Sequence, residues 1–316
     1  MCFKATIWQV WARSEESIIR VRDGKMKAGW VEERGFTLIE LLVVISVISL
    51  LMGILVPVMS KVRLEARGIK NMNNQKQIVS ALNLFASDND DRYPGSVAVA
   101  ADEGGSWNWS DPTRVTTMMI PAWTPHRAMG EHLRTYIPDA DTMYCPNAPH
   151  KHKYLQQAWD AGDDWDNPDT PMTRDLMGGT YCFYWNYRGY LPERDAVFTG
   201  PWGPASGGRR FSKLLVSDYF GYDHWRMEMA YGSCEPFRGA GVTPETSLLS
   251  AYWSRVNPAE STPEFKLRAA YTDGHVETYS PSDVVPMKVS VSPDGTKPYP
   301  DGMGYGTFFL PRKALY

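Results

Sequence analysis

The chain has 316 residues, of which 43% are hydrophobic, and its formal net charge at neutral pH is −3. This length accommodates one large or two smaller domains with a buried core, whereas the slightly acidic balance argues against the basic surface that nucleic acids require. The 26 glycines, 23 prolines and 12 tryptophans predict a fold with many loops rather than a regular helical bundle.

An uncharged apolar segment is the most prominent feature of the N-terminal part. It covers residues 41–58, which read LLVVISVISLLMGILVPV. As a helix, these 18 residues extend about 27 Å, close to the thickness of the hydrocarbon core of a bilayer. A buried helix of a soluble domain and a secretory signal are the alternatives, but no small-x-small cleavage site follows the run. We therefore predict a membrane-spanning helix at about 38–58.

The residues just before this segment, RGFTLIE, carry a second pattern. Gly35 directly precedes Phe36, and Glu40 is the fifth residue after the glycine. Pro57 is the twenty-second residue after the same glycine. A carboxylate in an apolar run is costly in lipid, so its presence predicts a function. Glycine leaves the backbone open to a peptidase, and proline bends a helix because it has no amide hydrogen.

With this spacing, Gly35, Phe36, Glu40 and Pro57 resemble the processing site of type IV prepilins and type II secretion pseudopilins. The resemblance implies that a prepilin peptidase cleaves after Gly35 and that Phe36 becomes the N-methylated first residue. It also implies a single-pass protein of the inner membrane with a periplasmic or otherwise extracytoplasmic C-terminal domain. Other pilin-like subunits would be its partners, through the N-terminal helix, in a fibre.

Two roles are open for Glu40. In a fibre, its carboxylate would pair with the N-terminal ammonium of a neighbouring subunit and so favour one register between the helices. In the unassembled subunit, the carboxylate would instead reach the lipid headgroups. The two roles belong to different stages, and both are compatible with the sequence.

Residues 1–35 form the expected leader, which is long for this family. A start at Met26 would shorten the leader to ten residues, so we interpret residues 1–25 as the result of a start site assigned too early. Residues 61–70, after the span, have a net charge of +3, whereas residues 27–34, before it, are neutral. The positive-inside rule alone would place the large domain in the cytoplasm, but the resemblance implies the opposite side, which we adopt.

After the span, the pattern predicts that the helix continues as an amphipathic helix, within a helical region of 36–88. Its apolar residues recur at intervals of three, four and seven, at Val58, Val62, Ile69, Met72, Val79, Leu82 and Phe85. The turn-forming sequence SDNDDRYPG ends it and resembles the helix exit of pseudopilins. Asp88, Asp90 and Asp91 in this turn are candidate cation ligands or, on the plainer interpretation, part of a solvated helix stop.

Residues 89–316 are predicted to form an extracytoplasmic globular domain with short strands. The predicted fold class is α+β, with the long N-terminal helix packed on a loop-rich antiparallel sheet. Residues 211–218, FSKLLVSD, read as a buried strand. Residues 101–130 and 156–175 are predicted to be loops, because they are rich in proline, glycine, aspartate and tryptophan.

A hairpin is predicted near the C-terminus. Two strands, 265–272 and 275–280, flank Asp273 and Gly274, a pair typical of a type I′ turn with positive φ at both central residues. The sequence DGHV at this turn resembles large prepilin-like proteins of Planctomycetes and related bacteria. The motif of those proteins has a histidine ten residues before Asp-Gly, where this chain has Pro263, so no role that depends on that histidine is carried over.

The four cysteines, Cys2, Cys145, Cys182 and Cys234, lack the CxxC spacing of zinc ribbons and redox motifs. Removal of the leader leaves three of them. In an oxidising compartment two of these three would pair, and the sequence leaves open which two.

Metal and cofactor sites have few candidates in this sequence. His150 and His152 would share one face of a strand, and Cys145 or an aspartate would complete a site, although a solvated loop is the plainer interpretation. The acidic loop PDGTKPYPDG at 293–302 is a candidate for calcium without EF-hand spacing. His275 follows the hairpin turn and is expected to help hold it. We expect no cofactor, with calcium as the alternative.

The function expected from these features is structural. The sequence contains no nucleophile elbow, zinc-binding helix motif or nucleotide-binding loop, so we expect no enzymatic activity. Cleavage after Gly35 leaves 281 residues, a size that favours a minor subunit of a type II secretion or type IV pilus-like fibre. The alternative is a membrane-anchored carbohydrate-binding protein or enzyme that uses the signal only for export. Aromatic segments 106–111 and 181–190 would stack on sugars if open, or staple the core if buried.

Overall fold

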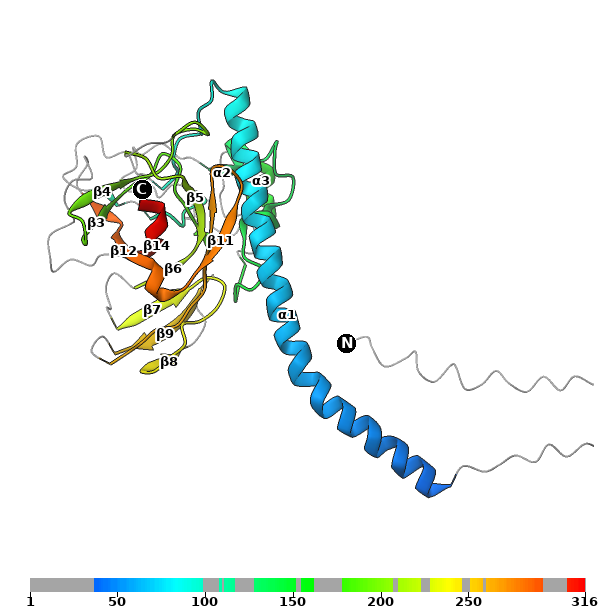
Figure 1. Ribbon diagram of the computed structural model, residues 1–316. Helices are drawn as coiled ribbons and strands as arrows, with labels where there is room; N and C mark the ends of the chain where they lie inside the picture. The colour runs from blue at the N-terminus through cyan, green and yellow to red at the C-terminus, as the bar shows by residue number, and fades with distance from the viewer. Residues whose placement is uncertain are drawn as a thin grey trace, which may run out of the picture. The chain divides into compact units, whose positions relative to one another are not determined.

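The structure is a computed structural model, and it describes residues 37–98, 108–109, 111–116, 128–151, 155–161, 178–206, 210–222, 228–245, 251–257, 260–291 and 306–315. It divides the chain into two compact units, one that ends at Pro57 and one that begins at Val58. Figure 1 shows one long helix followed by short helices and many strands. The observed class is α+β, as predicted.

Helix α1 comprises Leu38–Asp88 and contains Pro57 in its interior. The uncharged run forms its first part, and in the described residues α1 is the helix that is long and apolar enough to cross a membrane. The helix ends where Asp90 and Asp91 adopt φ angles of 52° and 57°. Such left-handed conformations stop an α-helix, so the acidic turn is the helix stop that the sequence predicted.

The remaining elements are short. The helices are α2 (Met129–Leu133), η1 (Ala140–Met143), α3 (Leu155–Ala161), η2 (Pro281–Asp283) and η3 (Arg312–Leu315). The strands are β1 (Asn108–Trp109), β2 (Tyr181–Phe183), β3 (Arg188–Leu191), β4 (Ala196–Thr199), β5 (Leu214–Asp218), β6 (Phe220–Tyr222), β7 (Met229–Gly232), β8 (Val242–Pro244), β9 (Tyr252–Val256), β10 (Leu267–Tyr271), β11 (Val276–Tyr279), β12 (Val284–Lys288), β13 (Ser290–Val291) and β14 (Thr307–Pro311). The buried strand predicted within 211–218 is confirmed as β5.

Within the described residues, the strands form three antiparallel sheets. The first has four strands in the order β11-β10-β5-β2, and the second has eight in the order β4-β3-β12-β14-β6-β7-β9-β8. The third is the pair β1 and β13. Strands that are distant in sequence therefore become neighbours: Ala269 of β10 lies opposite Ser217 of β5.

The four-stranded sheet lies between two apolar clusters. Successive side chains of a strand point to opposite faces, so β2 contributes to both clusters. Tyr181 and Phe183 pack with buried residues of α1, whereas Cys182 packs with residues of the eight-stranded sheet. The second unit is thus layered as helix, small sheet and large sheet, and Figure 1 shows α1 alongside β5 and β11.

The predicted hairpin is confirmed, but its turn is of another type. Strands β10 and β11 pair with Ala270 opposite Val276. Gly274 has a φ of +84°, but the φ angle of Asp273 is not positive. The Gly274 amide donates to the Tyr271 carbonyl at 2.8 Å, which closes an ordinary four-residue turn with glycine in its left-handed position. The loop is one residue longer than a type I′ hairpin, so only the glycine needs positive φ.

Part of the predicted loop at 156–175 is a helix. Helix α3 occupies Leu155–Ala161, and its Leu155 and Trp159 side chains are buried on one face. The indole Nε1 of Trp159 donates to the Ile137 carbonyl at 2.8 Å. The spacing of four between these two apolar residues is the helical signal that the loop-like composition obscured.

Candidate functional site

The N-terminal processing motif is the first part of the candidate site. Gly35 and Phe36 lie outside the described residues, and the described chain begins at Thr37. The Thr37 amide donates to the Glu40 carboxylate at 2.8 Å, and the Glu40 amide donates to the Thr37 hydroxyl oxygen at 3.2 Å. This reciprocal pair is a capping box, which satisfies two amide groups at the start of α1.

The capping box gives the Glu40 carboxylate a partner within its own subunit. The Thr37 hydroxyl also donates to the same carboxylate oxygen, at 2.9 Å. Glu40 is exposed in the single chain, so its second carboxylate oxygen stays open to another partner. Threonine followed three residues later by glutamate is the sequence signal of this box.

Pro57 lies on the same helix. The helix continues through it, although proline has no amide hydrogen to donate. Side chains on both sides of Pro57 are exposed, including Leu55 at 50% and Val58 at 50%. Exposed apolar side chains in this number require lipid or another helix to cover them.

The second part of the candidate site is the buried face of α1 beyond Val58. Val79 and Leu82 are fully buried there, as the apolar pattern predicted. One to two turns earlier, however, the buried residues are polar: Asn71 and Gln75 are both fully buried, and Asn74 is 5% exposed. Val62 and Ile69, which belong to the predicted apolar pattern, are exposed instead.

Asp218, at the end of β5, accepts hydrogen bonds from two of these buried side-chain amides. Its side chain is fully buried. Asn71 donates to Oδ1 of Asp218 at 2.7 Å, and Gln75 donates to the same oxygen at 2.9 Å. Asn74 donates to the Tyr144 carbonyl at 3.0 Å. The amides therefore fasten the helix to the sheet and to the loop after η1.

Arg268 on β10 completes this polar network. Its backbone amide and its guanidinium donate to Oδ2 of Asp218, at 3.1 Å and 3.3 Å. Burial raises the pKa of Asp218 from its ordinary value of 3.8 to about 6, against the lowering by Arg268 and Asn71. Gly68 lies directly over the guanidinium, where a Cβ atom would be 2.9 Å from a terminal nitrogen of Arg268. We call Asn71, Gln75, Asp218 and Arg268 the helix latch.

A disulfide lies next to the helix latch. Cys145 and Cys234 are bonded; their Cα atoms are 5.8 Å apart, and the two residues are separated by 89 positions in sequence. Cys182 is free and buried, and burial raises the pKa of its thiol. This settles the pairing that the sequence left open. Because Cys145 is engaged, it is not available to the metal site considered with His150.

The candidate cation ligands Asp88, Asp90 and Asp91 lie at the end of α1 and in the turn that follows it. Asp88 accepts a hydrogen bond from the Tyr136 hydroxyl at 2.6 Å, and Asp90 and Asp91 form the exposed turn that ends α1. Among the described residues, no group of three histidine, cysteine or acidic side chains is arranged to hold a metal. His152 and the loop 293–302 lie outside the described residues.

His275 lies at the hairpin, as predicted. Its amide donates to the Asp273 carboxylate at 3.1 Å, and its ring also contacts that carboxylate. The ring stacks on Tyr271 with centroids 4.4 Å apart and planes inclined by 7°. These contacts hold the turn against β10.

The aromatic segment 181–190 forms part of the core. Tyr181, Phe183, Tyr184 and Trp185 are all at most 2% exposed. Buried rings cannot stack on a sugar, so this segment stabilises the core on both faces of the four-stranded sheet. The side chains of segment 106–111 are largely outside the described residues.

Comparison with known proteins supports the first part of the site. Residues 32–56 match the family model described as a prokaryotic N-terminal methylation motif. No curated protein and no solved structure matches the chain. The matched range includes Gly35, Phe36 and Glu40 and ends just before Pro57. The chain therefore carries a prepilin-like N-terminal signal followed by an apolar helix that fits a membrane anchor.

Proposed function

We propose that this protein is a structural, non-enzymatic subunit of a fibre of the type II secretion or type IV pilus kind. A prepilin peptidase would cleave the precursor after Gly35, and Phe36 would be N-methylated. The subunit would wait in the inner membrane with its large domain outside the cytoplasm and would then enter the fibre through α1. The N-terminal match at residues 32–56 is the observation that carries this proposal.

The architecture of α1 supports this function. The first part of the helix exposes apolar side chains throughout, and its later part is fixed to the domain by the helix latch. A helix that is rigidly held at one end and apolar at the other can leave lipid and pack against other helices without losing the fold of its domain. The size of the domain favours a minor subunit.

The disulfide supports an extracytoplasmic domain. Cys145 and Cys234 pair although they are distant in sequence. Structural disulfides form and persist in the periplasm and outside the cell, whereas the cytoplasm keeps thiols reduced. The positive charge of residues 61–70 therefore does not decide the orientation.

Glu40 would act twice in this scheme. In the unassembled subunit, the capping box orders the start of the helix. In the fibre, the free carboxylate oxygen of Glu40 would accept a hydrogen bond from the N-terminal ammonium of a neighbouring subunit. A buried pair of this kind penalises every register that leaves the charge unpaired.

Substitutions of Glu40 test this role. In Glu40→Gln the capping box is preserved, since glutamine also caps, but the charge is lost. We expect Glu40→Gln and Glu40→Ala to be cleaved normally and both to disappear from the sheared fibre fraction. An unpaired buried ammonium costs about 3 kcal/mol or more, on the order of a 100-fold loss of incorporation.

The control is Glu65→Gln, which removes an exposed carboxylate from the same helix and should assemble as the wild type does. Normal incorporation of Glu40→Gln would contradict the charge-pairing role. Loss of incorporation in Glu40→Ala alone would assign Glu40 to helix capping instead.

A further inference from the structure

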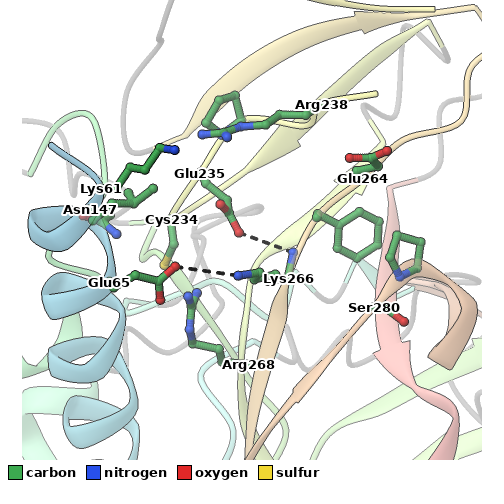
Figure 2. Close-up of a pocket in the computed structure, with 14 residues that line it drawn as sticks. Lys61, Glu65, Asn147, Cys234, Glu235, Arg238, Glu264, Lys266, Arg268 and Ser280 are labelled. Atoms are coloured by element: carbon green, nitrogen blue, oxygen red, sulfur yellow. Dashed lines mark hydrogen bonds and ion pairs between the residues drawn. The ribbon is translucent and has the colours of Figure 1, made fainter. Parts of the chain in front are cut away.

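A cavity of about 520 Å³ opens beside the later part of α1, next to the helix latch (Figure 2). Its charges are matched. Arg268 is bound to Asp218 in the helix latch. The other charged residues of the wall are equal numbers of cations and carboxylates: Lys61, Arg238, Lys266, Glu65, Glu235 and Glu264. Because these charges balance, the wall favours neither an anion nor a cation.

A smaller pocket of about 260 Å³ has a wall of a different kind. It lies where the end of α1 meets two loops, one between β2 and β3 and one after β4. Arg92 and Tyr93 follow the helix, Asn186 comes from the first loop, and Trp202 comes from the second. A space of this size suits one small ring, since pockets for larger organic ligands measure about 300 to 1,000 Å³.

Trp202 provides an aromatic face in this pocket. Its side chain is 38% exposed, and in the described part of the chain the other exposed large apolar side chains all belong to α1. The guanidinium carbon of Arg92 lies over the indole, 6.0 Å from the ring centroid. An indole in the wall of a pocket offers a large, rigid surface to a ligand that has an apolar face.

Hydrogen bonds of the main chain fix the position of this face. The Tyr93 amide donates to the Trp202 carbonyl at 2.8 Å, and the amides of Trp202 and Gly203 both donate to the Ser206 hydroxyl oxygen. Gly203 lies so close to the end of the helix that a Cβ atom would be 2.1 Å from the Asp91 carbonyl oxygen. The pocket is therefore preorganised, which lowers the entropic cost of binding.

Asn186 adds a fixed hydrogen-bond acceptor. Its φ angle is 51°, a conformation that residues other than glycine rarely adopt. Its Nδ2 atom donates to the carbonyls of Tyr93 and Pro94, at 3.2 Å and 2.8 Å. Its Oδ1 atom is thereby held in place, and it accepts no hydrogen bond from any residue that the structure describes. An acceptor fixed in this way favours a ligand that carries a hydroxyl donor.

The charge around the pocket favours a neutral ligand. Of the four wall residues, Arg92 is the charged one. Asp88, Asp90 and Asp91 lie within the four preceding positions and are exposed. These carboxylates offset the field of Arg92 for an approaching anion, whereas Arg92 itself repels a cation.

We propose that this pocket binds one pyranose unit of a neutral polysaccharide. One face of the sugar, which presents C–H bonds, would stack on Trp202. A ring hydroxyl would donate to Oδ1 of Asn186, and the Arg92 guanidinium would donate to a sugar oxygen. The proposal goes beyond the fibre function and does not rest on it, since the pocket lies within the unit that begins at Val58.

Saturation-transfer NMR on the mature full chain in nanodiscs tests this proposal, with methyl β-D-glucopyranoside as the probe. Irradiation of aromatic protons saturates the protein and not the lipids, which contain none. We expect transfer mainly to the C–H protons of one ring face, with a Kd of about 1 mM for a ligand of this size. In Trp202→Ala the affinity should fall about 30-fold, the loss expected when a central tryptophan contact is removed.

Two further variants make the result specific. Trp202→Phe retains an aromatic face and should retain part of the affinity. The matched control Trp253→Phe changes a half-buried tryptophan of β9 that does not line the pocket, and it should bind as the wild type does. Because the Trp202 side chain is exposed, Trp202→Ala should melt within a few degrees of the wild type.

Three results would overturn the proposal. The first is equal affinity of the wild type and Trp202→Ala, and the second is absence of transfer to the sugar in the wild type. The third uses acetylated hexaproline, which offers a stacking surface but no N–H or O–H donor for Asn186. Binding of this peptide as tight as that of the sugar would assign the pocket to proline-rich peptides instead.

Discussion

Replacing Asp218 with alanine is expected to lower the free energy of unfolding by about 3 to 5 kcal/mol at pH 7, the usual cost of removing one partner of a buried ion pair. The substitution leaves the guanidinium of Arg268, a residue that is 9% exposed, without its carboxylate. It also leaves the side-chain amides of Asn71 and Gln75 without the acceptor to which both donate. Denaturant unfolding of the purified mature chain measures this loss.

The pH dependence of the free energy of unfolding provides a second test of the Asp218 carboxyl group. The pKa of Asp218 rises from 3.8 to about 6 on folding, mainly through burial. The folded state therefore binds the proton more tightly, so the contribution of Asp218 to stability is fully present below about pH 4 and is lost as the pH rises through about 6. The expected fall is about 3 kcal/mol, and the alanine variant should lack it.

Two variants make the result specific. Asp218→Asn has the same shape, and the amides of Asn71 and Gln75 can turn their free oxygens toward its NH₂ group, so it should recover part of the loss. Glu245→Ala removes an exposed ion pair with Arg255 and should change stability by less than about 1 kcal/mol. A wild-type free energy of unfolding in Asp218→Ala would contradict the helix latch.

Removal of the disulfide is expected to have an effect of similar size. In Cys145→Ser with Cys234→Ser, the unfolded chain regains the freedom of a loop closed across 89 positions. Loop entropy of this kind corresponds to about 4 to 5 kcal/mol of stability at 25 °C. The double variant should therefore unfold at lower denaturant concentration than the wild type.

Reduction of the wild type provides the control. A reductant should destabilise the wild type to the level of the double variant and leave that variant unchanged, because Cys182 is not bonded. Equal stability of the wild type with and without reductant would show that the bond makes no contribution. Replacing Cys182 with alanine should preserve the response to reductant.

The processing motif and the long N-terminal helix could be predicted from sequence because their signals are local. The apolar run, Gly35, Glu40 and Pro57 lie within one short stretch, and α1 agrees with the helix predicted there. The capping box was equally readable, since Thr37 and Glu40 have the spacing of that motif.

The helix latch could not be predicted because its partners are far apart. Asn71 and Asp218 are 147 positions apart, and buried amides without a visible partner look like surface residues in sequence. The same holds for the pairing of Cys145 with Cys234, which depends on the loop after η1 meeting the end of β7. Short strands in a non-sequential order likewise leave little local pattern from which to derive the sheets.

The most direct test of the central claim is the mass of the native N-terminus. The protein is isolated from cells that contain the prepilin peptidase, and its N-terminal peptide is analysed by mass spectrometry. For the proposed pilin-like subunit we expect a chain that begins at Phe36 and carries one N-methyl group. An intact leader, with Gly35 still joined to Phe36, would contradict it.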